Sequence, residues 1–293
     1  MKICISCGKR HDGSGYKCPV CGTEPKFIGR IPLFSPELAM DNDGFKQEFF
    51  EELFFLEGNS FWFVARNKLI SWVIRKYFSQ VRNMLEIGCG TGYVLSGIKD
   101  AFPGMSLYGS EIFLEGLKFA DKRLSDVNLL QMDARYIPFE QEFDLIGIFD
   151  VLEHIDEEKT VLEQTYRAVK PGGGIILTVP QHKFLWSKHD ELACHVRRYE
   201  RKTLNMLIEK SGFKVERVTS FVSLLFPLIM FSRLNKKRRN NDPCSEYAIP
   251  GFINTVFQRI MSIERMLIER GVDFKWGSSL LVVAKKVRVV NTL

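Results

Sequence analysis

A glycine-rich turn in the first third of the chain most constrains the fold. Residues 84–92 read Met-Leu-Glu-Ile-Gly-Cys-Gly-Thr-Gly, and an apolar helical pattern resumes at Tyr93. A buried strand, a glycine turn and a helix in this order form the nucleotide-binding crevice of an open α/β sheet. Glycine permits a tight turn and lets a ligand approach the backbone without a Cβ in the way. This stretch therefore predicts a nucleotide-type ligand at the carboxyl end of a strand.

The carboxylate of Glu86, just before the turn, narrows the choice of ligand. Glycine turns of this kind serve NAD, FAD and S-adenosylmethionine (SAM). A carboxylate at this place repels a pyrophosphate but accepts hydrogen bonds from an ammonium group. The run from Glu86 to Gly92 closely resembles motif I of the class I SAM-dependent methyltransferases. The alternative is a tight strand–helix turn that binds no ligand.

Strands and helices alternate after this turn, which predicts an α/β fold with a parallel sheet and helices on both faces. Further strand patterns lie at residues 106–111, 127–132, 143–149, 169–180, 213–220 and 277–286. The resemblance implies a Rossmann-like class I methyltransferase sheet of seven strands, with the last strand antiparallel. That family normally joins its last two strands by a hairpin, so we expect residues 221–276 to form a helical insertion.

Other residues match further motifs of the same family. Glu111 follows Gly88 by 23 residues and ends the second strand, where an acidic side chain accepts from both ribose hydroxyls. Asp133-Ala134 resembles the pair that recognises adenine. The aromatic residues 61–63 with Arg66 resemble a lid whose arginine meets the methionine carboxylate; core packing and a solvated arginine are the alternatives. The resemblance implies these cofactor-binding residues: Trp62, Arg66, Glu86, Gly88, Cys89, Gly90, Gly92, Glu111, Ile112, Asp133, Ala134 and Asp150.

Two segments that contain histidine are candidates for the chemistry. Residues 150–154 read Asp-Val-Leu-Glu-His and resemble the O-methyltransferases of quinone biosynthesis, not the Asn/Asp-Pro-Pro turn of enzymes that methylate base amines. Residues 182–199 follow the fifth strand and concentrate histidines and arginines. A histidine can take the proton of an acceptor hydroxyl, although His154 can equally cap a helix. The candidate catalytic residues are His154, His189, Asp190, His195 and Tyr199, and Arg197 and Arg198 are candidates for holding an anionic substrate group.

The N-terminal segment carries two Cys-x-x-Cys pairs. Cys4 and Cys7 form the first pair, Cys18 and Cys21 form the second, and a glycine follows each pair. Four thiolates at this spacing make a closed tetrahedral site, which predicts a structural zinc ribbon without a catalytic role. A redox dithiol is the alternative, but no βαβ pattern accompanies it.

Composition and hydropathy limit the cellular setting. The formal charge of +6 is mild, and nucleic acid is not an expected partner. The chain shows no signal-peptide core and no apolar run that could span a bilayer, so we expect a cytoplasmic protein. Residues 221–231 are nearly all apolar, and the basic run Lys236–Arg239 follows. This pair of features indicates peripheral contact of Phe221 to Arg239 with an anionic membrane, such as the inner membrane face, or a lid over an apolar substrate. A buried cap helix is the alternative.

The chain is expected to divide into five segments: a zinc ribbon (1–30), a linker with a helical lid (31–80), the SAM-binding core (81–220), the insertion (221–276) and the final strand with its tail (277–293). The resemblance implies methyl transfer from SAM, and we expect an oxygen of a small-molecule or lipid-linked acceptor, such as a glycan or a quinone. The alternatives are a ribosomal RNA methyltransferase and a non-catalytic SAM-binding scaffold protein.

Overall fold

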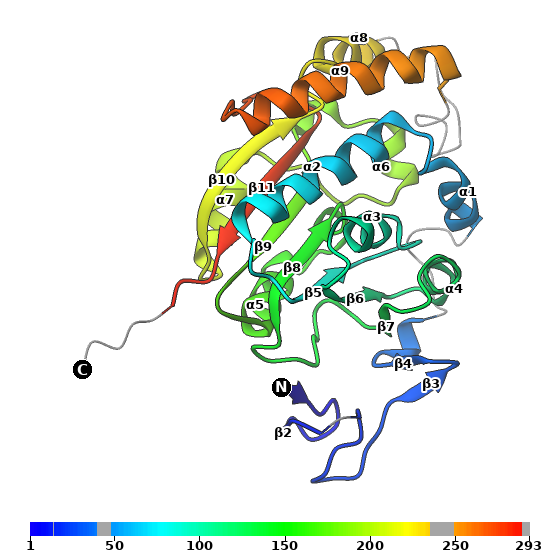
Figure 1. The fold of residues 1–293 in the computed structure, drawn as a ribbon, viewed down its shortest axis with the longest axis vertical. Helices are drawn as coiled ribbons and strands as arrows, with labels where there is room; N and C mark the ends of the chain where they lie inside the picture. The colour runs from blue at the N-terminus through cyan, green and yellow to red at the C-terminus, as the bar shows by residue number, and fades with distance from the viewer. Residues whose placement is uncertain (14, 40–47, 235–248, 289–293) are drawn as a thin grey trace.

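Within the residues that the structure describes, a nine-stranded mixed sheet forms the centre of the molecule (Figure 1). The computed structural model describes residues 1–13, 15–39, 48–234 and 249–288. The strand order is β10-β11-β9-β8-β5-β6-β7-β4-β3. The strands span β3 Lys26–Ile28, β4 Ile31–Leu33, β5 Asn83–Ile87, β6 Ser106–Glu111, β7 Asn128–Gln131, β8 Phe143–Phe149, β9 Val169–Pro180, β10 Lys214–Phe221 and β11 Ser279–Lys285.

The strand pairing confirms the expected methyltransferase core. Strands β5 to β9 pair in parallel, and β11 runs antiparallel between β9 and β10. Because the parallel strands share one direction, their carboxyl ends meet at one edge, where the glycine turn also lies. The sequence patterns had not included the two outer strands: β4 adds to β7 in parallel, and β3 pairs with β4.

Helices cover both faces of the sheet, and each face has its own apolar core. Ile70 of α2 and Leu95 of α3 contribute to one cluster, while Val161 of α5 and Leu204 of α7 contribute to the other. The helices span α1 Glu48–Leu56, α2 Phe61–Tyr77, α3 Tyr93–Ala101, α4 Leu114–Arg123, α5 Glu158–Ala168, α6 Lys188–Leu192, α7 Arg201–Lys210, α8 Phe226–Leu234 and α9 Gly251–Glu269.

The helical part of the expected segment 31–80 contains two helices in the described residues. α1 ends at Leu56 and α2 begins at Phe61, with Gly58 and Asn59 in the turn between them. The side chain of Asn254 fixes this turn, because it accepts from the Phe61 N–H and donates to the Asn59 carbonyl. The insertion thus holds the start of α2 in place.

In the described part of the expected insertion, residues 221–234 and 249–276 contain the helices α8 and α9, as expected. The apolar residues 221–231 are partly buried and partly exposed. Phe221 and Phe226 are buried, whereas Leu228 and Phe231 of α8 are 50% and 67% exposed. No helix within the described ranges is long and apolar enough to cross a bilayer. The basic run Lys236–Arg239, on which part of the membrane prediction depends, lies outside the described residues.

The N-terminal module docks on the amino-terminal half of the core. Strand β1 (Lys2–Ile3) pairs with β2 (Arg10–His11) on one side, and Ile3 N donates to the Pro138 carbonyl on the other. The boundary that we place after residue 30 falls inside the β3–β4 hairpin, so this module is continuous with the sheet. Figure 1 shows it at the opposite end of the molecule from α8 and α9.

Candidate active site

The glycine turn packs tightly against two side chains, those of Val151 and Leu124. Gly88, Gly90 and Gly92 all have positive φ angles, of 68°, 50° and 76°. A Cβ on Gly88 would lie 2.3 Å from Cγ2 of Val151, and a Cβ on Gly92 would lie 2.8 Å from Leu124. Both the backbone conformation and the space therefore require glycine at these two positions. Cys89, between them, is 5% exposed.

Glu86 and Glu111 place two carboxyl groups at this turn. Glu111 accepts from the backbone N–H groups of Gly90 (3.1 Å), Ile112 (2.8 Å) and Phe113 (3.2 Å). Within the described residues, no group donates to Oε2 of Glu86, which is 2% exposed. Burial raises the pKa of both carboxyl groups, and nearby carboxylates raise that of Glu86 further. A cationic ligand would supply the partner that Glu86 lacks.

Helix α1 covers one end of this crevice, which the sequence did not reveal. A ring carbon of Phe50 lies 3.9 Å from the Cβ position of Gly90 and 3.0 Å from that of Gly116. Glu57, directly after α1, accepts from the Thr91 hydroxyl (2.5 Å) and pairs with Arg123 (2.9 Å). These contacts attach α1 directly to the glycine turn.

Arg66 lies at the other end of the crevice. Its guanidinium pairs with the carboxylate of Asp150 and lies 4.4 Å from the ring centroid of Trp62. Asp150, with a φ of 56°, also accepts from the Thr178 hydroxyl (2.8 Å). The structure therefore brings these three predicted residues together, although Arg66 is engaged by a carboxylate of the chain itself.

The predicted adenine-recognition pair follows β7. Asp133 is 3% exposed and accepts from both the backbone N–H (2.8 Å) and Nε (3.1 Å) of Arg135. Ala134 is 7% exposed. Ile112 follows Glu111 at the end of the neighbouring strand β6, which pairs with β7. These residues lie at the same sheet edge as the glycine turn.

Four of the five candidate catalytic residues gather in one cluster. Nδ1 of His195 lies 2.9 Å from Oδ1 of Asp190, which also accepts from Nε of Arg198 (2.7 Å). The His195 ring centroid lies 4.8 Å from that of His154 and 6.2 Å from that of His189. Nε2 of His195 lies 4.0 Å from Oε1 of Glu153, a buried residue that sequence reasoning did not include.

The charge states within this cluster differ. Burial, together with the neighbouring His195, lowers the pKa of His154 to about 3, so His154 is neutral at neutral pH. Burial raises the pKa of Glu153 well above its usual value. Burial alone would raise the pKa of Asp190, but hydrogen bonds and charges from His195 and Arg198 outweigh it and hold the pKa below its usual range. Asp190 is thus the ionised group that orients His195.

Tyr199 and the two arginines are held by other groups of the chain. The Tyr199 hydroxyl donates to the Leu152 carbonyl (3.2 Å) and to Glu158 (2.5 Å). Arg197 pairs with Asp156 (3.1 Å) and also with Glu158, and the guanidinium of Arg198 is buried against Asp190. These contacts position the loop 182–199, and they leave the expected role of the arginines in anion binding without support.

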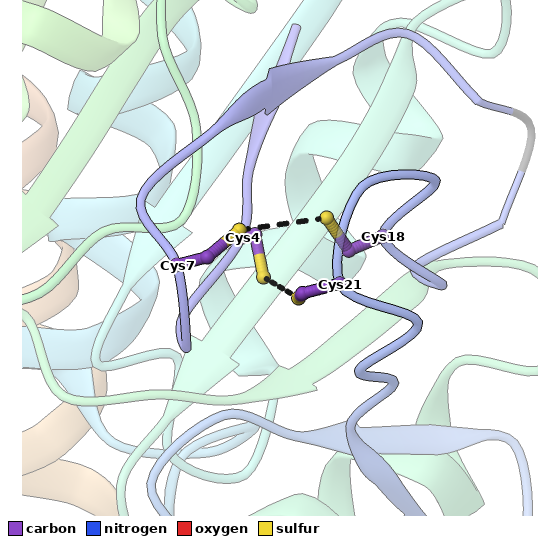
Figure 2. A group of neighbouring side chains, drawn as sticks. All are labelled: Cys4, Cys7, Cys18 and Cys21. Carbon is purple, nitrogen blue, oxygen red and sulfur yellow. Dashed lines mark hydrogen bonds between the residues drawn. The ribbon is translucent and has the colours of Figure 1, made fainter.

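The four N-terminal cysteines converge as the zinc prediction requires. Figure 2 shows their sulfur atoms pointing toward one another, with Cys4 and Cys21 3.5 Å apart and Cys7 and Cys18 3.7 Å apart. Zinc–sulfur bonds of about 2.3 Å in a tetrahedron place sulfur atoms about 3.8 Å apart, so this set fits one zinc ion. Gly8 and Gly22, with φ angles of 69° and 73°, close the two matching turns.

A Rossmann-like sheet with buried carboxyl groups at a glycine turn defines an α/β enzyme that binds a nucleotide-type cofactor. The chain belongs to the SAM-dependent methyltransferases, because the family model described as a methyltransferase domain matches residues 62–218. The matched residues begin after the ribbon and end before α8.

Individual relatives match over shorter stretches. The malonyl-[acyl-carrier protein] O-methyltransferase of Priestia megaterium is 25% identical over 114 residues, which are 38% of this chain and 42% of that protein. The ubiquinone biosynthesis O-methyltransferase of Dechloromonas aromatica is 28% identical over 116 residues, which are 37% of this chain and 49% of that protein. This chain therefore spans less than half the length of either relative.

A solved structure supports the fold. Phosphoethanolamine N-methyltransferase 2 of Haemonchus contortus, in complex with SAM, has a TM-score of 0.51 and 18% sequence identity. The match covers 76% of this chain and 53% of that chain.

SAM binding should release a proton. The raised pKa values mean that Glu86 and Glu111 carry protons to higher pH than usual when no ligand is bound, whereas a cationic ligand favours the ionised carboxylates. The affinity for SAM should therefore fall as the pH is lowered. Calorimetry in buffers of different ionisation enthalpy measures the release, and Glu86→Gln should reduce it. A heat that does not depend on the buffer, together with an affinity that stays constant as the pH is lowered, would contradict this account.

Cys18→Ser should lose bound zinc and lower the melting temperature, because one of four thiolates is removed. The affinity for SAM should stay within about twofold, since the ribbon docks far from the carboxyl edge. Elemental analysis, thermal melting and calorimetry measure these effects. Cys194→Ser, at a cysteine outside the cluster, is the matched control and should keep the metal. Freshly purified wild-type protein without metal would refute the site.

Proposed function

We propose that the protein transfers a methyl group from SAM to an oxygen atom of a small-molecule or lipid-linked acceptor. The pairing of Asp190 with His195 is the observation that carries this proposal. The names of the two curated relatives support an oxygen acceptor, since both are O-methyltransferases. Residues 150–154 also support an oxygen acceptor, because they resemble the O-methyltransferases of quinone biosynthesis. They contribute His154 to the same cluster.

The cofactor would be held by the crevice residues. Glu86 would accept from the ammonium of the methionine moiety, Glu111 from the ribose hydroxyls and Asp133 from adenine, while Arg66 would exchange Asp150 for the methionine carboxylate. Bound SAM supplies a methyl group already activated by its sulfonium. The protein therefore has to align the acceptor, exclude water and accept one proton.

His195 is the proposed proton acceptor. The ionised Asp190 accepts from Nδ1–H of His195 and thus selects the tautomer whose Nε2 carries a free lone pair. Arg198 holds Asp190 in turn, so the orientation of the imidazole depends on a buried ion pair. His154 is the weaker candidate, because a side chain with a pKa of about 3 accepts protons poorly near neutral pH. His189 and Tyr199 have proposed positioning roles beside the pair.

Apolar side chains near the same edge suit an acceptor with an apolar portion. His182 stacks with Phe184 and with Trp276, at ring-centroid distances of 4.9 Å and 5.0 Å, and the centroids of those two rings lie 6.5 Å apart. Phe184 and Trp276 are 57% and 59% exposed. Aromatic surfaces of this kind accommodate quinone rings or lipid chains.

The direct test is transfer of labelled methyl groups from SAM into fractionated cell extracts. The proposal expects the label in a lipid or small-molecule fraction, in a base-stable ether or a base-labile ester. Label found only in RNA would favour the ribosomal alternative. SAM binding without label in any fraction would favour the scaffold alternative, and either result would overturn the proposal.

With a labelled fraction in hand, His195→Ala should lower kcat by roughly 10²–10⁴-fold, because a general base is lost. Asp190→Asn should lower kcat by a comparable factor, since it removes the charge that selects the tautomer. The kcat of each variant is measured beside that of the wild type over a range of pH values. His154→Gln is the matched comparison and should keep the wild-type pH profile. A His195→Ala enzyme with an unchanged rate and profile would exclude histidine base catalysis.

A further inference from the structure

Helix α9 exposes a second apolar face. Its inner face packs on the core through Met261 and Ile268, which are 4% and 1% exposed. On the outer side, four apolar residues recur at helical spacing, so they form one stripe along the helix. These residues and their exposed fractions are Phe252 (83%), Val256 (38%), Ile263 (50%) and Met266 (41%). A helix that is apolar on two sides normally has both sides covered.

Helix α8 extends this surface. Leu228 and Phe231 are 50% and 67% exposed, and Figure 1 shows α8 and α9 at the same end of the molecule. The turn that leads into α8 is attached to α9, because the backbone N–H groups of Ser223 and Leu224 donate to Glu264. Contiguous exposed apolar side chains of this size mark an interaction surface. We call this set the outer apolar surface: Leu228, Phe231, Phe252, Val256, Ile263 and Met266.

A cationic groove lies beside the outer apolar surface. It has a volume of about 210 Å³, runs between α2 and α9, and is lined by Lys68, Arg259 and Arg265, with no carboxylate among its lining residues. Arg265 pairs with Glu269. Across the described ranges, Lys68 and Arg259 form no ion pair with the chain. The groove thus presents two uncompensated positive charges.

The two features share one helix face. Arg259 lies between Val256 and Ile263 in the helical repeat, so its charge stands level with the exposed apolar side chains. Cationic groups at the height of inserted apolar side chains are the arrangement by which interfacial helices bind anionic bilayers. A free phosphate ion would account for the groove but not for the exposed apolar stripe.

We infer that this end of the molecule docks on an anionic membrane. The outer apolar surface enters the boundary between headgroups and acyl chains, and the cationic groove holds a lipid phosphate. This inference goes beyond the proposed function, because it does not depend on which acceptor is methylated. The docked end lies at the carboxyl edge of β8 and β9, so the candidate active site faces the same side (Figure 1).

The test measures binding of the full chain to vesicles. Vesicles of phosphatidylcholine with phosphatidylglycerol should bind the protein, and vesicles of phosphatidylcholine alone should bind it much more weakly. Lys68→Ala with Arg259→Ala should weaken binding to the anionic vesicles roughly 25-fold, about fivefold for each cation. The control is Lys202→Ala with Lys210→Ala, which removes the same charge from two exposed lysines of α7. It should weaken binding by no more than about threefold, which is about the limit of a diffuse charge effect.

The apolar part has its own variant. Phe252→Ser with Ile263→Ser should also weaken binding to anionic vesicles by more than about tenfold, through lost burial of apolar area. Equal binding to both vesicle types, or wild-type binding by both double variants, would overturn the inference. Saturable binding of inorganic phosphate without vesicle binding would make the groove a phosphate site and overturn it too.

Unchanged melting temperatures and SAM affinities separate a docking effect from misfolding. The cofactor crevice contains none of the substituted residues. The variants can therefore lose vesicle binding while SAM binding, on which the proposed function depends, stays unchanged.

Discussion

Buried carboxyl groups beside a tight glycine turn are the constraint on which the candidate active site depends. Glu86 and Glu111 are held where water is excluded, and Glu86 Oε2 has no donor among the described residues. Such groups are costly in the folded protein unless a ligand compensates them. The turn can pack against Val151 and Leu124 only because Gly88 and Gly92 lack a Cβ. The site thus stores unfavourable energy that a cationic cofactor would relieve.

The surrounding contacts close the crevice from two sides. Phe50 and Glu57 attach α1 to the turn, and Arg66 pairs with Asp150 at the opposite end. The catalytic cluster follows the same logic of buried charge, because Asp190 stays ionised only through Arg198 and His195. At the crevice, Glu57 and Arg66 are positioned by partners far away in the sequence, whereas Asp190 is held by two residues of its own loop.

The sequence predicted the features that depend on local pattern. The glycine turn and the four-cysteine cluster follow from residue spacing, the antiparallel last strand follows from the family resemblance, and the structure confirms all three. It did not predict β3, β4 or the role of α1, because short edge strands and the lid of Phe50 depend on contacts far apart in the chain. It also could not reveal that Arg198 is buried against Asp190, since a loop sequence does not indicate which charges pair.

The affinity of Glu111→Gln for SAM tests the central claim most directly. The substitution keeps the shape of the side chain but removes its charge and one acceptor capacity, so calorimetry should show a loss of about 1.5–3 kcal/mol, roughly 10- to 150-fold in affinity. A substitution on the neighbouring strand, such as Gln131→Glu, does not touch the turn and cannot replace this comparison. The comparison requires a Glu111→Gln protein that is correctly folded. If that protein binds SAM with wild-type affinity, the buried carboxylates do not hold the cofactor and the site has been assigned to the wrong crevice.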